Sequence, residues 1–147
     1  MKYDVCIIGC GISGASIAFE LSKYKLNVLV LEKENDVSLG TSKANSAIIH
    51  AGYDPLPGTK MARLNVLGSK KIEQLAPLLN FHYKQIGSLV IGRKKEDKEK
   101  IDSLFKRGIQ NGVLGLRILS SREEILALGE QNLKEDIDYA LYAPTAA

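Results

Sequence analysis

Three glycines near the start of the chain have the spacing that binds a diphosphate. Gly9, Gly11 and Gly14 follow the apolar run 5–8 and lead into a segment with helical character. The first glycine permits a tight turn, the second lets the backbone approach a ligand, and the third lets the helix pack closely on a strand. Because a helix N-terminus carries unpaired N–H groups and a partial positive charge, a diphosphate can bind there without a basic side chain.

A carboxylate completes this pattern. Glu32 follows the second apolar run, 28–31, where it can accept hydrogen bonds from ribose hydroxyls and disfavour a 2′-phosphate. The chain has 13 glycines, so their spacing alone is a weak signal. The order of strand, glycine turn, helix, strand and acid is what indicates a dinucleotide site. The alternative is an ordinary βαβ unit in which the glycines serve packing alone.

A second group of polar residues lies between 41 and 52. A long polar connection, 33–43, leads to small hydroxyl and amide side chains, and the apolar pair 48–49 then predicts a short strand before His50. A neutral imidazole can take a proton from an alcohol, or it can orient a ligand by hydrogen bonding. The alternative for His50 is a buried structural histidine with a satisfied N–H.

Other residues could also take part in a site. Tyr53, Lys60 and Arg63 could meet an anionic group, although a solvated helix face explains the two cations as well. His82 lies in a predicted strand, where packing or exposure is the ordinary role. The chain has two cysteines, at positions 6 and 10, with no metal-ligand spacing, so we expect reduced thiols and no metal site.

The elements that would position these residues follow from hydrophobic spacing and turn residues. The first helix is expected to turn Ala15, Ala18, Leu21 and Tyr24 toward one face. Beyond it the pattern predicts a turn at 54–58, a helix from Met61 to a fraying end at Pro77, and a strand over 81–92. A second helix is expected from the charged run 93–100 to a stop at Asn111-Gly112, followed by a strand over 116–119. A short helix capped by Ser121 and Glu124 is expected to end at Gly129, before a strand over 138–143.

Composition sets outer limits on the function. The 147 residues are 45% hydrophobic and 25% charged, which is typical of a globular chain and not of a disordered or collagen-like one. A formal net charge of +3 gives little support to nucleic-acid binding. No apolar run approaches the roughly 20 residues of a transmembrane segment. We expect a cytoplasmic protein, and peripheral attachment to a membrane through a partner stays open.

Together these motifs resemble a known family. The glycine motif, Glu32, the segment 41–53 and the segment 57–66 are similar to FAD-dependent oxidoreductases of the D-amino-acid oxidase superfamily, over essentially the whole chain. FAD-dependent glycerol-3-phosphate dehydrogenases are most similar, with L-2-hydroxyglutarate oxidases very near. The first helix of this family usually ends in glycine. Here Lys25 would have to adopt the left-handed conformation, or the helix would end differently.

The resemblance implies an α/β fold with a flavin site built from several segments. A Rossmann-like FAD-binding βαβ unit in 1–80 would precede the first part of an α+β substrate domain with antiparallel strands in 81–142, and 143–147 would return to the flavin domain. The implied FAD contacts are Gly9, Gly11, Ser13 and Gly14 at the pyrophosphate, Glu32 and Lys33 at the adenosine ribose, Thr41, Ser42, Asn45 and Ser46 at the phosphates and ribityl chain, and His50 and Gly52 beside the isoalloxazine.

The implied function is oxidation of a secondary alcohol by hydride transfer to the flavin, with His50 as the candidate catalytic residue. Glycerol 3-phosphate is the expected small anionic substrate, L-2-hydroxyglutarate is the alternative, and the electron acceptor stays open. Because members of this family continue far past residue 147, we expect a portion of a longer protein that exposes apolar faces and binds FAD poorly alone. The glycine motif and Glu32 would also fit a non-catalytic NAD-binding sensor, which has no reason to carry the segment 45–50.

Overall fold

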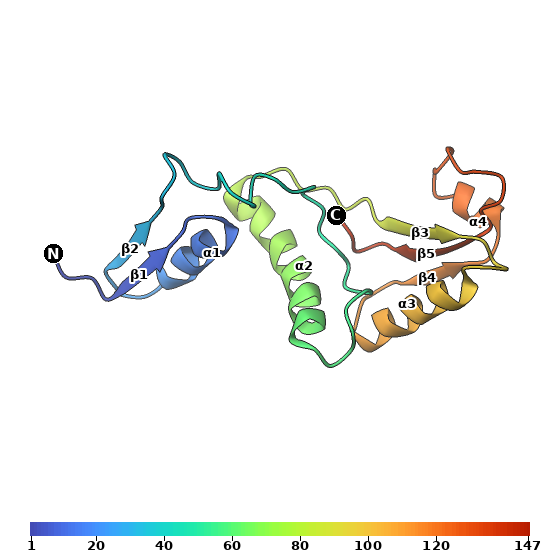
Figure 1. Ribbon diagram of the computed structural model, residues 1–147, viewed down its shortest axis with the longest axis horizontal. Helices are drawn as coiled ribbons and strands as arrows, with labels where there is room; N and C mark the ends of the chain where they lie inside the picture. Colours follow the sequence, from blue (N-terminus) through green and yellow to red (C-terminus); the bar gives the residue numbers. More distant parts are fainter. The chain divides into compact units, whose positions relative to one another are not determined.

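The chain forms two compact units. The computed structural model describes residues 1–147, with one unit at Met1–Ala47 and the other at Ile48–Ala147 (Figure 1). The boundary between the units, after Ala47, lies before residue 80, the predicted end of the flavin-binding domain. The domain limits implied by the resemblance stay a prediction, and each unit is described by itself.

The first unit is a βαβ unit, as predicted. Strand β1 (Val5–Ile8) pairs in parallel with β2 (Val28–Leu31), and helix α1 (Ile12–Leu21) connects them. Ile7 is buried, whereas Ile8 and its neighbour Leu31 on the other face are 88% and 50% exposed. A parallel sheet is ordinarily covered on both faces. The unit therefore presents the kind of exposed apolar surface that the sequence analysis expected.

Helix α1 ends without a left-handed residue. Its C-cap, Ser22, has a φ of −62° and donates its N–H to the carbonyl of Ala18. No residue from 22 to 27 has a positive φ, so the left-handed conformation considered for Lys25 does not occur. Tyr24 lies beyond the helix in the following turn, and the expectation that it shares the helix face was wrong.

The second unit is built on an antiparallel sheet in the order β3-β5-β4. Its strands are β3 (Ser88–Gly92), β4 (Arg117–Leu119) and β5 (Tyr139–Ala143). Side chains along β5 alternate between two cores, because successive residues of a strand point to opposite faces. Leu141 packs with Ile101 of α3 (Lys98–Gln110), and Ala140 packs with Ile125 of α4 (Arg122–Leu126). Figure 1 shows these two helices on opposite sides of the sheet.

Helix α2 (Lys60–Leu79) precedes the sheet in the chain. The hydroxyl of Thr59 caps it by accepting the N–H of Ala62 at 3.2 Å, and Asn80, in the left-handed conformation at φ 51°, ends it. Pro77 lies inside the last turn and does not mark a frayed end, since the helix continues to Leu79.

Two expected strands differ from the structure. The pair 48–49 is not a regular strand, although Ile49 exchanges two backbone hydrogen bonds with Ala147, at 2.7 and 3.1 Å. The strand expected over 81–92 is regular only from Ser88, because Gly87 has a positive φ of 75° that interrupts it. His82 is therefore exposed outside a strand.

The helix predicted from the charged run 93–100 begins only at Lys98. The Asp97 carboxylate accepts the N–H of Arg93 at 3.0 Å and closes a turn ahead of it. Helix α4 likewise ends at Leu126, before the predicted end at Gly129, and turns follow. No helix in the structure combines the length and apolar character that crossing a membrane requires.

Candidate functional site

The glycine turn of the first unit has the backbone geometry that its sequence predicts. Gly9 has a φ of 94°, a conformation that favours glycine, and its N–H donates to the carbonyl of Leu31 at 2.7 Å. Gly14 is buried, and a Cβ at that position would lie 2.0 Å from the carbonyl oxygen of Gly9. Glycine is thus required at both positions, one for the turn and one for the approach of α1 to it.

The N-terminus of α1 has backbone N–H groups of the kind that bind an anion. Gly11 is its N-cap and has no side chain to fill the place, and a Cβ there would meet the hydroxyl oxygen of Ser42 at 2.8 Å. That hydroxyl accepts the N–H of Ile12 at 2.8 Å. The N–H groups of Ser13 and Gly14 follow in the first turn, where an α-helix has no acceptors of its own. The Ser42 oxygen therefore lies beside Gly11, and the N–H groups of Ser13 and Gly14 are those that a ligand could use.

Glu32 has a second role that sequence reasoning missed. Its Oε2 accepts the N–H of Cys10 at 2.7 Å, and its Oε1 accepts the N–H groups of Lys33 and Glu34 at 2.9 and 3.2 Å. These bonds, the one from Cys10 above all, hold the pKa of the carboxyl below its ordinary value. A carboxylate has about four acceptor sites. Glu32 therefore ties the end of β2 to the glycine turn and keeps capacity for a ribose hydroxyl.

The segment 33–47 is held to the glycine turn at two points, through Ser42 and through the N–H of Ser38, which donates to the carbonyl of Cys10 at 3.0 Å. Asn45 bonds within the segment, because its Nδ2 donates to the carbonyl of Ser42 at 2.7 Å and its Oδ1 accepts the N–H of Ala47 at 2.7 Å. The structure thus brings Ser42 to the glycine turn and leaves four predicted contacts of this segment exposed, namely Lys33, Thr41, Asn45 and Ser46.

His50 lies in the second unit at a hollow of about 410 Å³, whose lining includes Gly52, Tyr53, Met61 and Asn65. The imidazole is exposed, so the alternative of a buried structural histidine does not describe it. Tyr53 shares this hollow. An exposed imidazole beside a cavity can exchange a proton with a bound molecule.

Lys60 and Arg63, which could bind an anionic group, lie away from the hollow at His50. Lys60 and Arg63 line a separate hollow of about 350 Å³ with Thr59, and both are exposed. Neither residue is among those that line the hollow at His50.

Gly52 is fixed tightly next to His50. It is buried with a φ of 106°, and a Cβ there would lie 2.7 Å from Cγ2 of Val66 on α2. The end of α3 holds the backbone around it, since Nδ2 of Asn111 donates to the carbonyls of Gly52 and Pro55 at 2.9 and 2.8 Å. Sequence reasoning assigned Asn111 only to a helix stop, and no local signal announced these distant partners.

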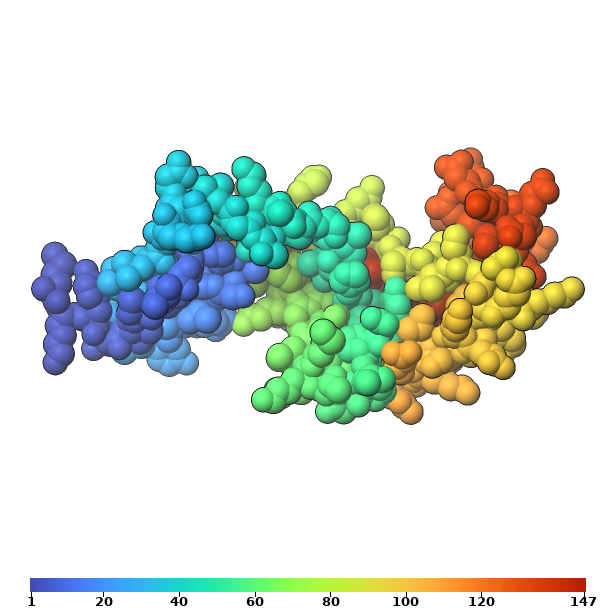
Figure 2. Space-filling view, in the orientation of Figure 1, coloured from blue at the N-terminus to red at the C-terminus, as the bar shows by residue number.

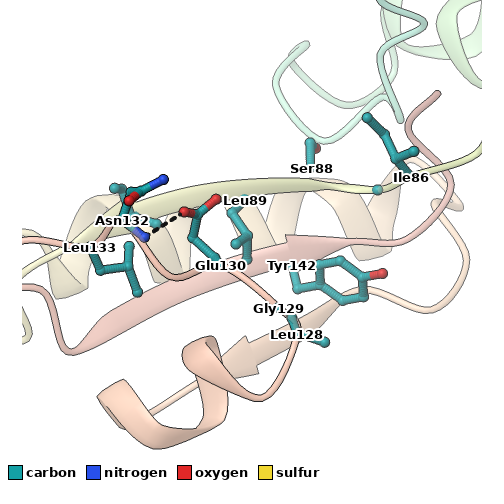
Figure 3. A pocket seen from close by; sticks show the side chains of 11 residues that line it. Ile86, Ser88, Leu89, Leu128, Gly129, Glu130, Asn132, Leu133 and Tyr142 are labelled. Carbon is teal, nitrogen blue, oxygen red and sulfur yellow. Dashed lines mark hydrogen bonds between the residues drawn. The ribbon is translucent and has the colours of Figure 1, made fainter.

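A larger hollow, about 600 Å³, lies between strands β3 and β5 and the segment that follows α4 (Figure 3). In Figure 2 the orange-red atoms of that segment lie directly above the yellow atoms of β3 and the residues after it. Its walls are about equally polar and apolar, and the apolar side chains include Leu89, Leu133 and Tyr142. Its one charged side chain is Glu130, which accepts the N–H of Asn132 at 3.0 Å. A carboxylate disfavours an anionic ligand there, and none of the predicted site residues lines it.

Comparison with known proteins decides the family. The family model described as DAO, FAD dependent oxidoreductase, matches residues 4–147. The chain belongs to this family of FAD-dependent oxidoreductases. The chain is 49% identical over 143 residues to a glycerol 3-phosphate dehydrogenase of Caloramator mitchellensis. The aligned residues make up 97% of this chain and 29% of the relative. The chain is 38% identical over 128 residues to a mitochondrial L-2-hydroxyglutarate dehydrogenase of Dictyostelium discoideum, covering 86% of this chain and 29% of the relative.

A solved structure supports the fold of this FAD-dependent oxidoreductase. The dithionite-reduced L-α-glycerophosphate oxidase of Mycoplasma pneumoniae with FAD bound aligns with a TM-score of 0.87 at 34% identity. The alignment covers 99% of this chain and 38% of that one. The chain therefore spans about a third of the length of the relatives named here.

The first unit has the donor set that a flavin dinucleotide requires. The diphosphate of the cofactor needs several N–H donors close together, and the first turn of α1 beside Gly11 has such donors. The adenosine ribose of the cofactor needs an acceptor near the end of the second strand, and the carboxylate of Glu32 is such an acceptor. The residues present fit this cofactor.

Proposed function

We propose that the gene product is an FAD-dependent enzyme that oxidises the secondary alcohol of a small anionic substrate, and that this substrate is glycerol 3-phosphate. The observation that carries the proposal is the N-terminus of α1, where Gly11 and Gly14 have no side chains and Glu32 is bonded to the turn. The relatives named glycerol 3-phosphate dehydrogenase and L-α-glycerophosphate oxidase support the choice of substrate.

The roles of the residues follow from their chemistry. The N–H groups of Ser13 and Gly14 would hold the diphosphate, and Glu32 would accept from the adenosine ribose. Thr41 and Ser46 offer exposed hydroxyls to the remaining polar parts of the cofactor. When bound, FAD accepts two electrons and the hydrogen from the carbon that bears the hydroxyl, so that the alcohol becomes a ketone.

His50 would remove the proton of the substrate hydroxyl. Its exposed imidazole lies at a hollow, and an imidazole can both accept and donate a proton. General-base catalysis of this kind contributes typically about 10²- to 10⁴-fold to a rate.

L-2-hydroxyglutarate is the second candidate substrate, because the relative of that activity is 38% identical to this chain. Both candidates are anionic secondary alcohols, so the same proton acceptor serves either. A non-catalytic NAD sensor is less well supported, since a sensor does not need an exposed imidazole beside a hollow.

Cofactor extraction and a substrate comparison test the proposal. The full-length gene product is expected to release FAD on denaturation and to turn over glycerol 3-phosphate with a kcat/KM well above that for L-2-hydroxyglutarate. A reversed preference would move the function to the second candidate. A colourless protein stabilised by NAD against thermal unfolding would overturn the flavin assignment.

A further inference from the structure

The loop next to His50 is held by side chains from the end of α3. Nδ2 of Asn111 donates to two carbonyls of this loop, those of Gly52 at 2.9 Å and Pro55 at 2.8 Å. Nη1 of Arg107, one helical turn earlier, donates to the carbonyl of Asp54 at 2.8 Å. Three carbonyls within four consecutive loop residues are thus bound by two side chains.

The contact between α3 and this loop is also close sterically. A Cβ at Gly108 would lie 2.9 Å from Cβ of Tyr53 and 2.3 Å from Cδ1 of Leu116. Gly108 therefore lets the helix approach the loop near enough for Asn111 and Arg107 to reach its carbonyls. The hydrogen bonds from Asn111 and Arg107 and the close approach at Gly108 therefore all fix the loop 52–55 against α3.

The orientation of the Asn111 amide is fixed by its partners. With Nδ2 facing two carbonyls, the opposite orientation would place Oδ1 against two acceptors. The price is that Oδ1 is buried without a hydrogen-bond donor. An unsatisfied buried acceptor is unfavourable. A helix end that only needed stability would be served better by a side chain without this atom.

We infer that Asn111 and Arg107 are positioning residues, which hold the backbone of 52–55 so that His50 and Gly52 present a fixed geometry to the flavin and substrate. This inference rests on the proposed function, because it assigns the loop to the reacting end of the site. Neither residue touches the reacting atoms, and both act through the loop.

A double-mutant cycle tests the inference in the flavin-loaded, full-length gene product. Asn111→Ala is expected to lower kcat about 10- to 100-fold, because a small displacement of a catalytic group costs that much, with a smaller change in KM. In a His50→Gln background the same substitution should lower kcat much less, since it acts through His50. The flavin absorbance spectrum should shift as well. Gln110→Ala, an exposed neighbour on α3, is the matched control.

Arg107 supplies a second variant if Asn111→Ala does not fold. Arg107→Met removes the donor to Asp54 and keeps most of the side-chain stem, and it should reduce kcat in the same coupled way. Arg107→Lys restores a donor and should recover part of the activity. Folded, flavin-loaded variants whose effects on kcat are absent, or simply add to that of His50→Gln, would overturn the inference. A wild-type protein that binds no flavin would instead overturn the proposed function.

Discussion

At the scale of single residues, Gly14 has the strictest requirement. A Cβ at this position would lie 2.0 Å from a backbone oxygen, so the turn or the helix must move to admit it. We expect Gly14→Ala to lower the free energy of unfolding by about 1–3 kcal/mol, as overpacking does, and to abolish flavin retention. Chemical denaturation and the ratio of flavin to protein after gel filtration measure both effects.

Gly68 provides the control for that substitution. It lies within α2 with nothing within 4 Å of its would-be Cβ. Gly68→Ala should stabilise by roughly 0.5–1 kcal/mol, because alanine is the better helix former. A Gly14→Ala protein as stable and as yellow as Gly68→Ala would show that the glycine turn does not depend on close packing.

A substitution at Glu32 can test whether its charge, and not only its size, supports FAD binding. Glu32→Gln keeps the length of the side chain but removes the charge that strengthens its bonds to the turn and to a ribose, so FAD should bind on the order of tenfold more weakly. Because the hydrogen bonds from Cys10, Glu34 and Lys33 lower the pKa of this carboxyl below its ordinary value of 4.5, the carboxyl stays charged until the pH falls through the lowered pKa. Flavin titrations from neutral to acidic pH should therefore show a constant difference between the two proteins at neutral pH, which shrinks only in the acid range.

At the scale of elements, Tyr139 joins β5 to α3. Its hydroxyl donates to Oδ1 of Asp102 at 2.6 Å, and Lys98 also bonds that carboxylate. Tyr139→Phe should cost about 1–2 kcal/mol of stability, since a hydrogen bond to a charged group is lost at a partly exposed carboxylate. The bonds from Lys98 and Tyr139 lower the pKa of Asp102, so this cost should be constant at neutral pH and shrink as the pH falls below 3.8. A cost independent of pH in unfolding curves would contradict the assignment.

The cap of α4 is a second test at this scale. The Ser121 hydroxyl accepts the N–H of Glu124 at 3.3 Å, and the Glu124 carboxylate accepts the N–H of Ser120 at 2.6 Å. Ser121→Ala should therefore destabilise by about 1 kcal/mol, the typical value for a lost N-cap. Ser120→Ala, whose side chain is exposed, should change stability by less than about 0.5 kcal/mol. Equal effects in thermal unfolding would argue against the cap.

The elements also show what sequence can and cannot supply. Gly9 and Gly14 were predictable because their turn and helix are formed by neighbours in the chain. The partners of Asn111 lie 56 and 59 residues away, so nothing in its local sequence announces them. Asn45 was predicted as a cofactor contact, yet its amide bonds within its own loop. The 48–49 pair resembles a strand locally, but only Ile49 finds a backbone partner, at Ala147.

At the scale of the whole molecule, the proposed function draws on residues of both units. Under this proposal, residues of the first unit would bind the diphosphate and ribose, and His50 belongs to the second unit. His50→Gln should retain FAD while lowering kcat about 10²- to 10⁴-fold, as the loss of a general base does. Loss of flavin together with activity would instead indicate that His50 serves cofactor binding.

Anaerobic reduction by substrate tests the central claim most directly. The full-length gene product is mixed with glycerol 3-phosphate in the absence of oxygen, and the absorbance of the bound flavin is followed. We predict that the yellow colour bleaches in a single turnover and that a ketone is formed in equal amount. Bound FAD that remains oxidised with glycerol 3-phosphate, or a protein that carries no flavin, would contradict the account.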